Sequence, residues 1–192
     1  QQPSRREDLL AVEEPLEIRV GGRSLAITMR TPGHDFDLAA GFLVSEGVIS
    51  ARDHFSTARY CAGAGEEHLN TYNILDVTLG QGVPPPDPSL ERSFYTTSSC
   101  ELSGKASIDA VRTHSVFSVT EDATAITAEM LASLPDRLRS EQTVFEQTGG
   151  LHAAALFDVT TGELLVLRED IGRHNAVDKV VGWALMSDRI PL

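Results

Sequence analysis

The residue best suited to chemistry is Cys100, which lies in a polar segment between a predicted strand and a predicted helix. Hydroxyl side chains precede it, and one of them can cap the helix that follows. Unpaired amides at a helix start favour a thiolate, as does the nearby cation of Lys105, and the thiolate is the reactive form of cysteine. The carboxylate of Glu101 acts in the opposite direction, because a nearby negative charge disfavours the thiolate. The segment predicts a reactive cysteine, and the alternative is a small buried cysteine near a helix start.

The other cysteine, Cys61, lies in a Gly- and Ala-rich stretch without charge or a helix signal, and we interpret it as incidental. Two cysteines cannot form a disulfide framework or a cysteine-rich zinc site by themselves. The sequence also contains no HExxH motif, no phosphate-binding P-loop and no zinc-deaminase signature.

A glycine pair precedes His152, and an apolar run at 152–159 predicts a strand buried on both faces. Gly149 and Gly150 allow positive φ or a close approach of the backbone to a ligand. His152 can hydrogen-bond a ligand or carry a proton. The alternative is a histidine that satisfies a loop carbonyl.

A dense charged segment, 168–174, is predicted to be a loop that leads into the last helix. Ligands of open α/β sheets gather at strand ends and helix starts, so Arg173 and the helix amides are candidates to hold phosphate. His174 is a second candidate for proton transfer, and Asn175 is expected to cap the helix. The alternative is a solvated loop whose ion pairs add little stability. The remaining histidines are expected to be surface or packing residues: His34, His54, His68 and His114.

These candidates need a framework of strands and helices, which hydrophobic periodicity predicts. Strands are expected at 16–20, 25–29, 75–79, 92–96, 116–119, 152–159 and 163–167. Helices are expected at 35–46, at 105–112, after an N-cap at Thr127 with a break or restart at Pro135, and after Asn175. The interleaved order indicates a mixed-sheet, layered α/β fold. We expect an N-terminal β-hairpin element at 1–34 and an α/β domain at 35–192.

The net charge of −12 over 192 residues argues against nucleic-acid binding, which needs clustered Lys and Arg. No run approaches the roughly 20 apolar residues of a membrane span. No signal peptide is visible near the start. We therefore expect a cytoplasmic protein without nucleic-acid or membrane partners.

The segments taken together resemble the formate dehydrogenase accessory sulfurtransferase family (FdhD-type), whose motifs occur here in the same order. The matching stretches are 13–16 (EEPL), 29–33 (MRTPG), 38–43 (LAAGFL), 45–47 (SEG), 97–100 (TSSC), 104–108 (GKASI), 148–155 (TGGLHAAA) and 169–179 (EDIGRHNAVDK).

The resemblance implies a cytidine-deaminase-like fold, a homodimer and a sulfurtransferase activity. It implies that Cys100 takes persulfide sulfur from a cysteine desulfurase and passes it to the molybdenum (or tungsten) bis-guanine-dinucleotide cofactor, which activates formate dehydrogenase. No tightly bound metal is expected. The candidate catalytic residues are Cys100, Lys105, His152 and His174. The candidate cofactor-binding residues are Arg173, Gly149, Gly150 and Asn175.

The chain departs from the family pattern in its cysteine loop, where Ser103 replaces a second cysteine and Glu101 replaces a glycine. The family also continues past Leu192, so we expect this chain to be truncated. One cysteine suffices for a persulfide carrier, since each transfer uses one sulfur at a time. Two alternatives stay open: a cofactor-binding chaperone without sulfur transfer, favoured by Ser103, and a hydrolase that uses Cys100 with a histidine.

Overall fold

The computed structural model describes residues 8–61, 72–87, 116–117, 120 and 122–192. Its elements are β1 (Glu14–Val20), β2 (Arg23–Arg30), α1 (Asp35–Ser45), the 3-10 turn η1 (Arg52–His54), β3 (Phe55–Tyr60), β4 (Ile74–Leu79), α3 (Ala128–Glu141), α4 (Thr143–Thr148), β5 (His152–Phe157), β6 (Leu164–Asp170) and α5 (Arg173–Met186). Cys100 and Lys105 lie outside the described residues. So do the strand expected at 92–96 and the helix expected at 105–112.

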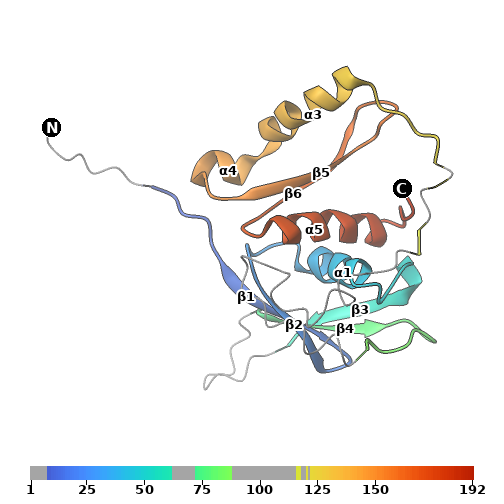
Figure 1. Ribbon diagram of the computed structural model, residues 1–192. Helices are drawn as coiled ribbons and strands as arrows, with labels where there is room; N and C mark the ends of the chain where they lie inside the picture. Colours follow the sequence, from blue (N-terminus) through green and yellow to red (C-terminus); the bar gives the residue numbers. More distant parts are fainter. Residues whose placement is uncertain (1–7, 62–71, 88–115, 118–119, 121) are drawn as a thin grey trace, which may run out of the picture.

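A four-stranded mixed sheet forms the lower layer in Figure 1, in the order β2-β1-β4-β3. Strand β1 pairs antiparallel with β2 and parallel with β4. The predicted hairpin is confirmed, and it turns at Gly21 and Gly22, whose φ angles of 58° and 81° suit a two-residue hairpin turn. The residues predicted as an N-terminal element thus share a sheet with later strands, and the division at residue 34 stays a prediction.

The main hydrophobic core lies between this sheet and α1. Alternate residues of β1 and β4 point to the helix, as a sheet with one covered face requires. The predicted helix at 35–46 is confirmed as α1. The fully or almost fully buried apolar side chains here are Leu16, Ile18, Leu38, Leu43, Phe55, Leu75, Val77 and Leu185.

Helices α1 and α5 cross in close backbone contact, which joins the sheet to the upper layers (Figure 1). A Cβ atom on Gly41 would overlap the carbonyl of Asp178, and one on Gly182 would overlap the carbonyl of Asp37. The hydroxyl of Ser45 donates to the carboxylate of Asp178 at 2.7 Å. Only glycine permits such an approach, so the two helices act as one layer.

A second, two-stranded antiparallel sheet of β5 and β6 lies on α5, and α3 and α4 lie on its far side (Figure 1). The predicted return strand is thereby confirmed. The described residues form a mixed, layered α/β fold, as the sequence predicts.

Strand β5 differs from its prediction, because it is not buried on both faces. His152 is exposed and the other residues of β5 are half-buried. The cause is the loose outer layer, since no residue of α3 is buried.

Pro135 does not break α3, which continues through it. The proline lies on an exposed part of the helix, and the carbonyl that loses its partner belongs to exposed Leu131, where water can replace the missing bond. Thr127 caps α3 as predicted, accepting a hydrogen bond from the amide of Met130 at 3.1 Å.

The charged segment 168–174 is not a loop. Strand β6 extends to Asp170 and α5 begins at Arg173, so only two residues connect them. The N-cap of α5 is Gly172, and the prediction that Asn175 caps this helix is wrong because its amide bonds elsewhere.

Strand β3, the turn η1 and the residues 116–117 also differ from the sequence prediction. The polar strand β3 and the turn η1 were not predicted. Val116 and Phe117 lie in a bend rather than in the strand expected at 116–119, whose other two residues lie outside the described part.

In the described part of the chain, no helix is both long and apolar enough to cross a membrane.

Candidate functional site

A buried ion pair occupies the junction between β6 and α5. Lys179 and Asp170 are 1% and 0% exposed, and the Nζ–Oδ2 distance is 2.6 Å. Asp170 ends β6 and Lys179 lies two helical turns into α5, so the ion pair spans the short turn between them. The second carboxylate oxygen of Asp170 accepts from the amide of Gly172 at 2.8 Å.

The same ion pair binds the chain segment that follows β2. The amide of Thr31 donates to Asp170 Oδ2 at 3.1 Å, and the carbonyl of Thr31 accepts from Lys179 Nζ at 2.9 Å. The hydroxyl oxygen of Thr31 accepts from the amide of Ile171 at 3.1 Å. Thr31 is therefore attached to the β6–α5 turn through its amide, its carbonyl and its side chain.

Asn175 adds a further connection between the same segments. Its Nδ2 donates to Asp170 Oδ1 at 3.0 Å and to the carbonyl of Met29 at 2.7 Å. Its Oδ1 accepts from the hydroxyl of Thr28 at 3.2 Å. These bonds hold the buried amide inside the protein, and the predicted role of Asn175 in cofactor binding stays a prediction.

A second buried ion pair, Arg30–Asp35, joins the residues on either side of the turn 31–34. The guanidinium of Arg30 contacts both carboxylate oxygens of Asp35, at 3.2 and 3.0 Å, and it also contacts Glu14 at 3.4 Å. The hydroxyl of Tyr60 donates to Asp35 at 3.1 Å. Burial, followed by the charge of Asp35, raises the pKa of Tyr60 to about 12.

These two ion pairs enclose the turn 31–34, whose residues Pro32, Gly33 and His34 are exposed. His34 has left-handed backbone geometry, with φ of 58°. Partial burial of the ring, followed by the positive charge of Arg168, lowers the pKa of His34. Its exposure agrees with the sequence interpretation of His34 as a surface or packing residue.

The predicted downstream residues gather around the same junction. His152 pairs with Asp170 across the β5–β6 ladder and is exposed. Arg173 and His174 are exposed at the start of α5. Gly149, with φ of 68°, and Gly150 connect α4 to β5 and are also exposed.

Glu169 orients the start of α4 toward this junction. Its carboxylate accepts from the amides of Val144 and Phe145 at 3.0 and 2.7 Å. A carboxylate in this position is the favourable partner for the free amides of a helix start. The sequence interpretation did not assign this role to Glu169.

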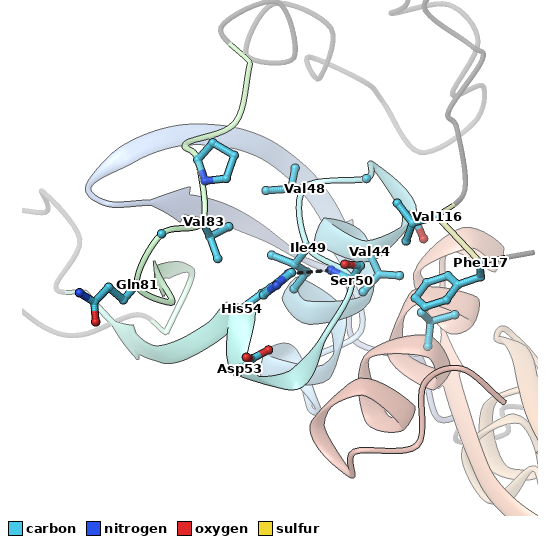
Figure 2. A pocket seen from close by; sticks show the side chains of 15 residues that line it. Val44, Val48, Ile49, Ser50, Asp53, His54, Gln81, Val83, Val116 and Phe117 are labelled. Carbon is cyan, nitrogen blue, oxygen red and sulfur yellow. Dashed lines mark hydrogen bonds between the residues drawn. The ribbon is translucent and has the colours of Figure 1, made fainter.

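A cavity of about 570 Å³ lies at the C-terminal end of α1, at a different place in the fold (Figure 2). Its lining combines apolar and polar side chains. Its lining comprises Val44, Ser45, Gly47, Val48, Ile49, Ser50, Asp53, His54, Gln81, Gly82, Val83, Pro84, Val116, Phe117 and Val181. A space of this size suits a small molecule or part of a larger one.

Two features of this cavity bear on chemistry. His54 Nδ1 accepts from the amide of Ser50 at 3.2 Å, which leaves Nε2 as the donor of the neutral ring (Figure 2). Pro84 and Val116 stand on either side of the segment 88–115, which contains Cys100, and both line the cavity. Arg52 and Asp53 precede His54 in the sequence, a shorter charged run than the one around His174.

The described residues contain no candidate metal site and a single cysteine. No group of three or more His, Cys, Asp or Glu side chains in this part of the chain is placed to hold a metal ion. Cys61 is a half-buried free thiol directly after β3.

The fold and the junction define a class of protein: a layered α/β protein with exposed histidine and arginine side chains held around a buried ionic network. The FdhD/NarQ family matches residues 11–191, almost the whole chain. The chain belongs to this family.

Curated relatives are similar in sequence to this chain over nearly its whole length. It is 58% identical over 187 residues to "Sulfur carrier protein FdhD" of Mycolicibacterium paratuberculosis, covering 97% of this chain and 68% of the relative. It is 60% identical over 190 residues to the protein of the same name from Streptomyces avermitilis, covering 98% and 67%. The chain thus spans about two thirds of the length of these relatives.

A solved structure supports the fold. The crystal structure of a formate dehydrogenase accessory protein from Desulfotalea psychrophila aligns with a TM-score of 0.61 and 23% identity, covering 94% of this chain and 62% of that chain. At this identity the similarity concerns the fold alone. The cytidine-deaminase-like arrangement stays a prediction.

Proposed function

We propose that this chain is a sulfur carrier in which Cys100 is the sulfur-bearing residue. The main support is the identity of 58–60% to relatives named sulfur carrier proteins, over 97–98% of the chain. The polar segment around Cys100 adds chemical support, because the sequence predicts a helix after it and places the cation of Lys105 nearby, and both would favour a thiolate.

The loading step is a thiol–disulfide type exchange. The Cys100 thiolate attacks the outer sulfur of a persulfide on a cysteine desulfurase. A new S–S bond forms on Cys100, and the desulfurase cysteine departs with the electron pair of the broken bond. In delivery, the outer sulfur would pass to the molybdenum bis-guanine-dinucleotide cofactor, the substrate. The cofactor would donate the electron pair of its new bond to sulfur and so be oxidised by two electrons, while the pair of the broken S–S bond returns to Cys100.

The exposed residues at the β6–α5 junction suit the recognition of that cofactor. Arg173 can contact its phosphates as a bidentate donor, and Gly149 and Gly150 leave the backbone open to a ligand. His152 and His174 are the proposed proton carriers.

The proposed partners are a cysteine desulfurase and formate dehydrogenase, and the proposed state is a cytoplasmic homodimer. The direct test is activation of formate dehydrogenase in cells that lack their own carrier. Cys100→Ala should abolish activation, whereas Cys61→Ala, the matched control, should retain it. Activation by Cys100→Ala at the wild-type level refutes the carrier role.

Ser103 favours a second candidate, a chaperone that holds and delivers the cofactor without transferring sulfur. A serine cannot relay sulfur or resolve a disulfide, so the loop lacks one of the family's two thiols. Unchanged nucleotide affinity in Cys100→Ala, together with no persulfide on the wild-type chain, would favour the chaperone.

A further inference from the structure

Lys179 is one of two lysines in the chain, and it is almost completely buried. An ammonium group has three N–H donors. In Lys179 they meet the carboxylate of Asp170, the carbonyl of Thr31 at 2.9 Å and the carbonyl of Glu169 at 3.4 Å. Each donor direction is therefore used inside the protein.

The partners of Lys179 belong to separate parts of the chain. Thr31 follows β2, and Glu169 and Asp170 end β6, about 140 positions later in the sequence. Asp170 extends the connection, because it also accepts from the amides of Thr31 and Gly172. Two turns, the exposed turn 31–34 and the half-buried β6–α5 turn 171–172, are thus fixed to one buried ion pair.

Stability alone does not explain a charge pair at this position. A buried ion pair loses its hydration, and well-packed apolar side chains of similar volume often stabilise a protein equally well. What apolar side chains cannot do is hold two main-chain turns through directed hydrogen bonds. The geometry of the pair is therefore its distinguishing property.

We propose that Lys179 is a positioning residue that acts through Asp170 and Thr31. It holds the turn 31–34 and the β6–α5 turn 171–172, which leads to exposed Arg173, in one fixed arrangement, on which the phosphates of the nucleotide cofactor dock. This inference rests on the proposed function, because it concerns the cofactor that the carrier would serve. Lys179 itself stays buried and contacts no ligand.

The test compares full-length variants for binding of guanosine diphosphate, the nucleotide part of the proposed cofactor, by calorimetry. Lys179→Met and Asp170→Asn each remove one charge, and the double variant removes both without leaving an unpaired buried charge. Lys179→Arg keeps the charge. Arg19→Met is the control, because it breaks an ion pair elsewhere in the fold, Arg19–Glu17 at 2.8 Å, with no bond to Thr31.

The single and double variants should bind the nucleotide about ten- to hundred-fold more weakly, the range typical of lost supporting contacts. Lys179→Arg should recover part of this loss, and Arg19→Met should stay within about twofold of wild type. Persulfide loading of Cys100 should not change. Amide hydrogen exchange should accelerate at Thr31 and Gly172 in Lys179→Met but not in Arg19→Met, a local change that general loss of stability does not produce.

Wild-type affinity in the folded double variant would overturn the inference. Failure of the wild-type chain to bind the nucleotide would instead refute the proposed cofactor site. In that event, the exchange of Thr31 and Gly172 still decides whether Lys179 holds the turns, and unchanged exchange in a folded variant overturns it.

Discussion

Arg30 carries its charge into the interior, where the carboxylate of Asp35 and the carbonyl of Tyr72 surround the guanidinium. Arg30→Met leaves the Asp35 carboxylate buried without its partner, so we expect the free energy of unfolding to fall by about 3–5 kcal/mol. Urea denaturation measures the change. The matched control is Arg19→Met, whose partly exposed pair with Glu17 should contribute at most about 1 kcal/mol. Equal losses in the two variants would contradict this account of the buried pair.

The ionisation of Tyr60 makes the stability of the folded protein depend on pH in the alkaline range. Burial and the Asp35 charge raise the pKa of Tyr60 to about 12 in the folded protein, whereas an unfolded tyrosine ionises near about pH 10. Its stabilising contribution is thus fully present below about pH 10 and is lost as the pH rises toward about 12. Denaturation of wild type and Tyr60→Phe across this range should show the gap in stability closing. Ultraviolet detection of a Tyr60 tyrosinate already at about pH 10 would contradict the assignment.

The helix pair depends on two glycines at its crossing. Gly41→Ala and Gly182→Ala each place a methyl group against the backbone of the opposite helix. Overpacking of this kind costs about 1–3 kcal/mol, which exceeds the gain of about 1 kcal/mol in helix propensity. Denaturation should show a net loss in both variants. Gly150→Ala is the control, because its nearest atoms are 3.9 Å from the new Cβ and little should change. A gain in stability at Gly41 would show that the helices do not pack in this way.

Local patterns were sufficient to predict some elements and insufficient for others. The β1–β2 hairpin and α1 were predictable because their apolar residues repeat with the period of a strand or a helix. Strand β3 was missed because half of its residues are exposed and polar, so its place depends on pairing with β4. The end of β6 was misjudged because its charges have distant partners, which a local pattern cannot reveal.

At the scale of the whole molecule, the candidate site is made of segments far apart in the sequence. Thr31 and Asp170 are 139 positions apart, and neither is distinctive alone. Sequence analysis found the exposed residues Arg173 and His174 because charge clustering is visible locally. It missed the role of Lys179, because a single lysine in a helix looks like any exposed one until the fold encloses it.

The central claim is that Cys100 carries sulfur, and persulfide loading tests it most directly. The full chain is incubated with cysteine and a cysteine desulfurase without reducing agent, and peptide masses are then measured. The account predicts that the peptide containing Cys100 gains one sulfur atom, which a thiol reductant removes, while the peptide containing Cys61 does not. Cys61→Ala should load like wild type. Loading confined to Cys61, or a Cys100 peptide of unchanged mass, would contradict the account.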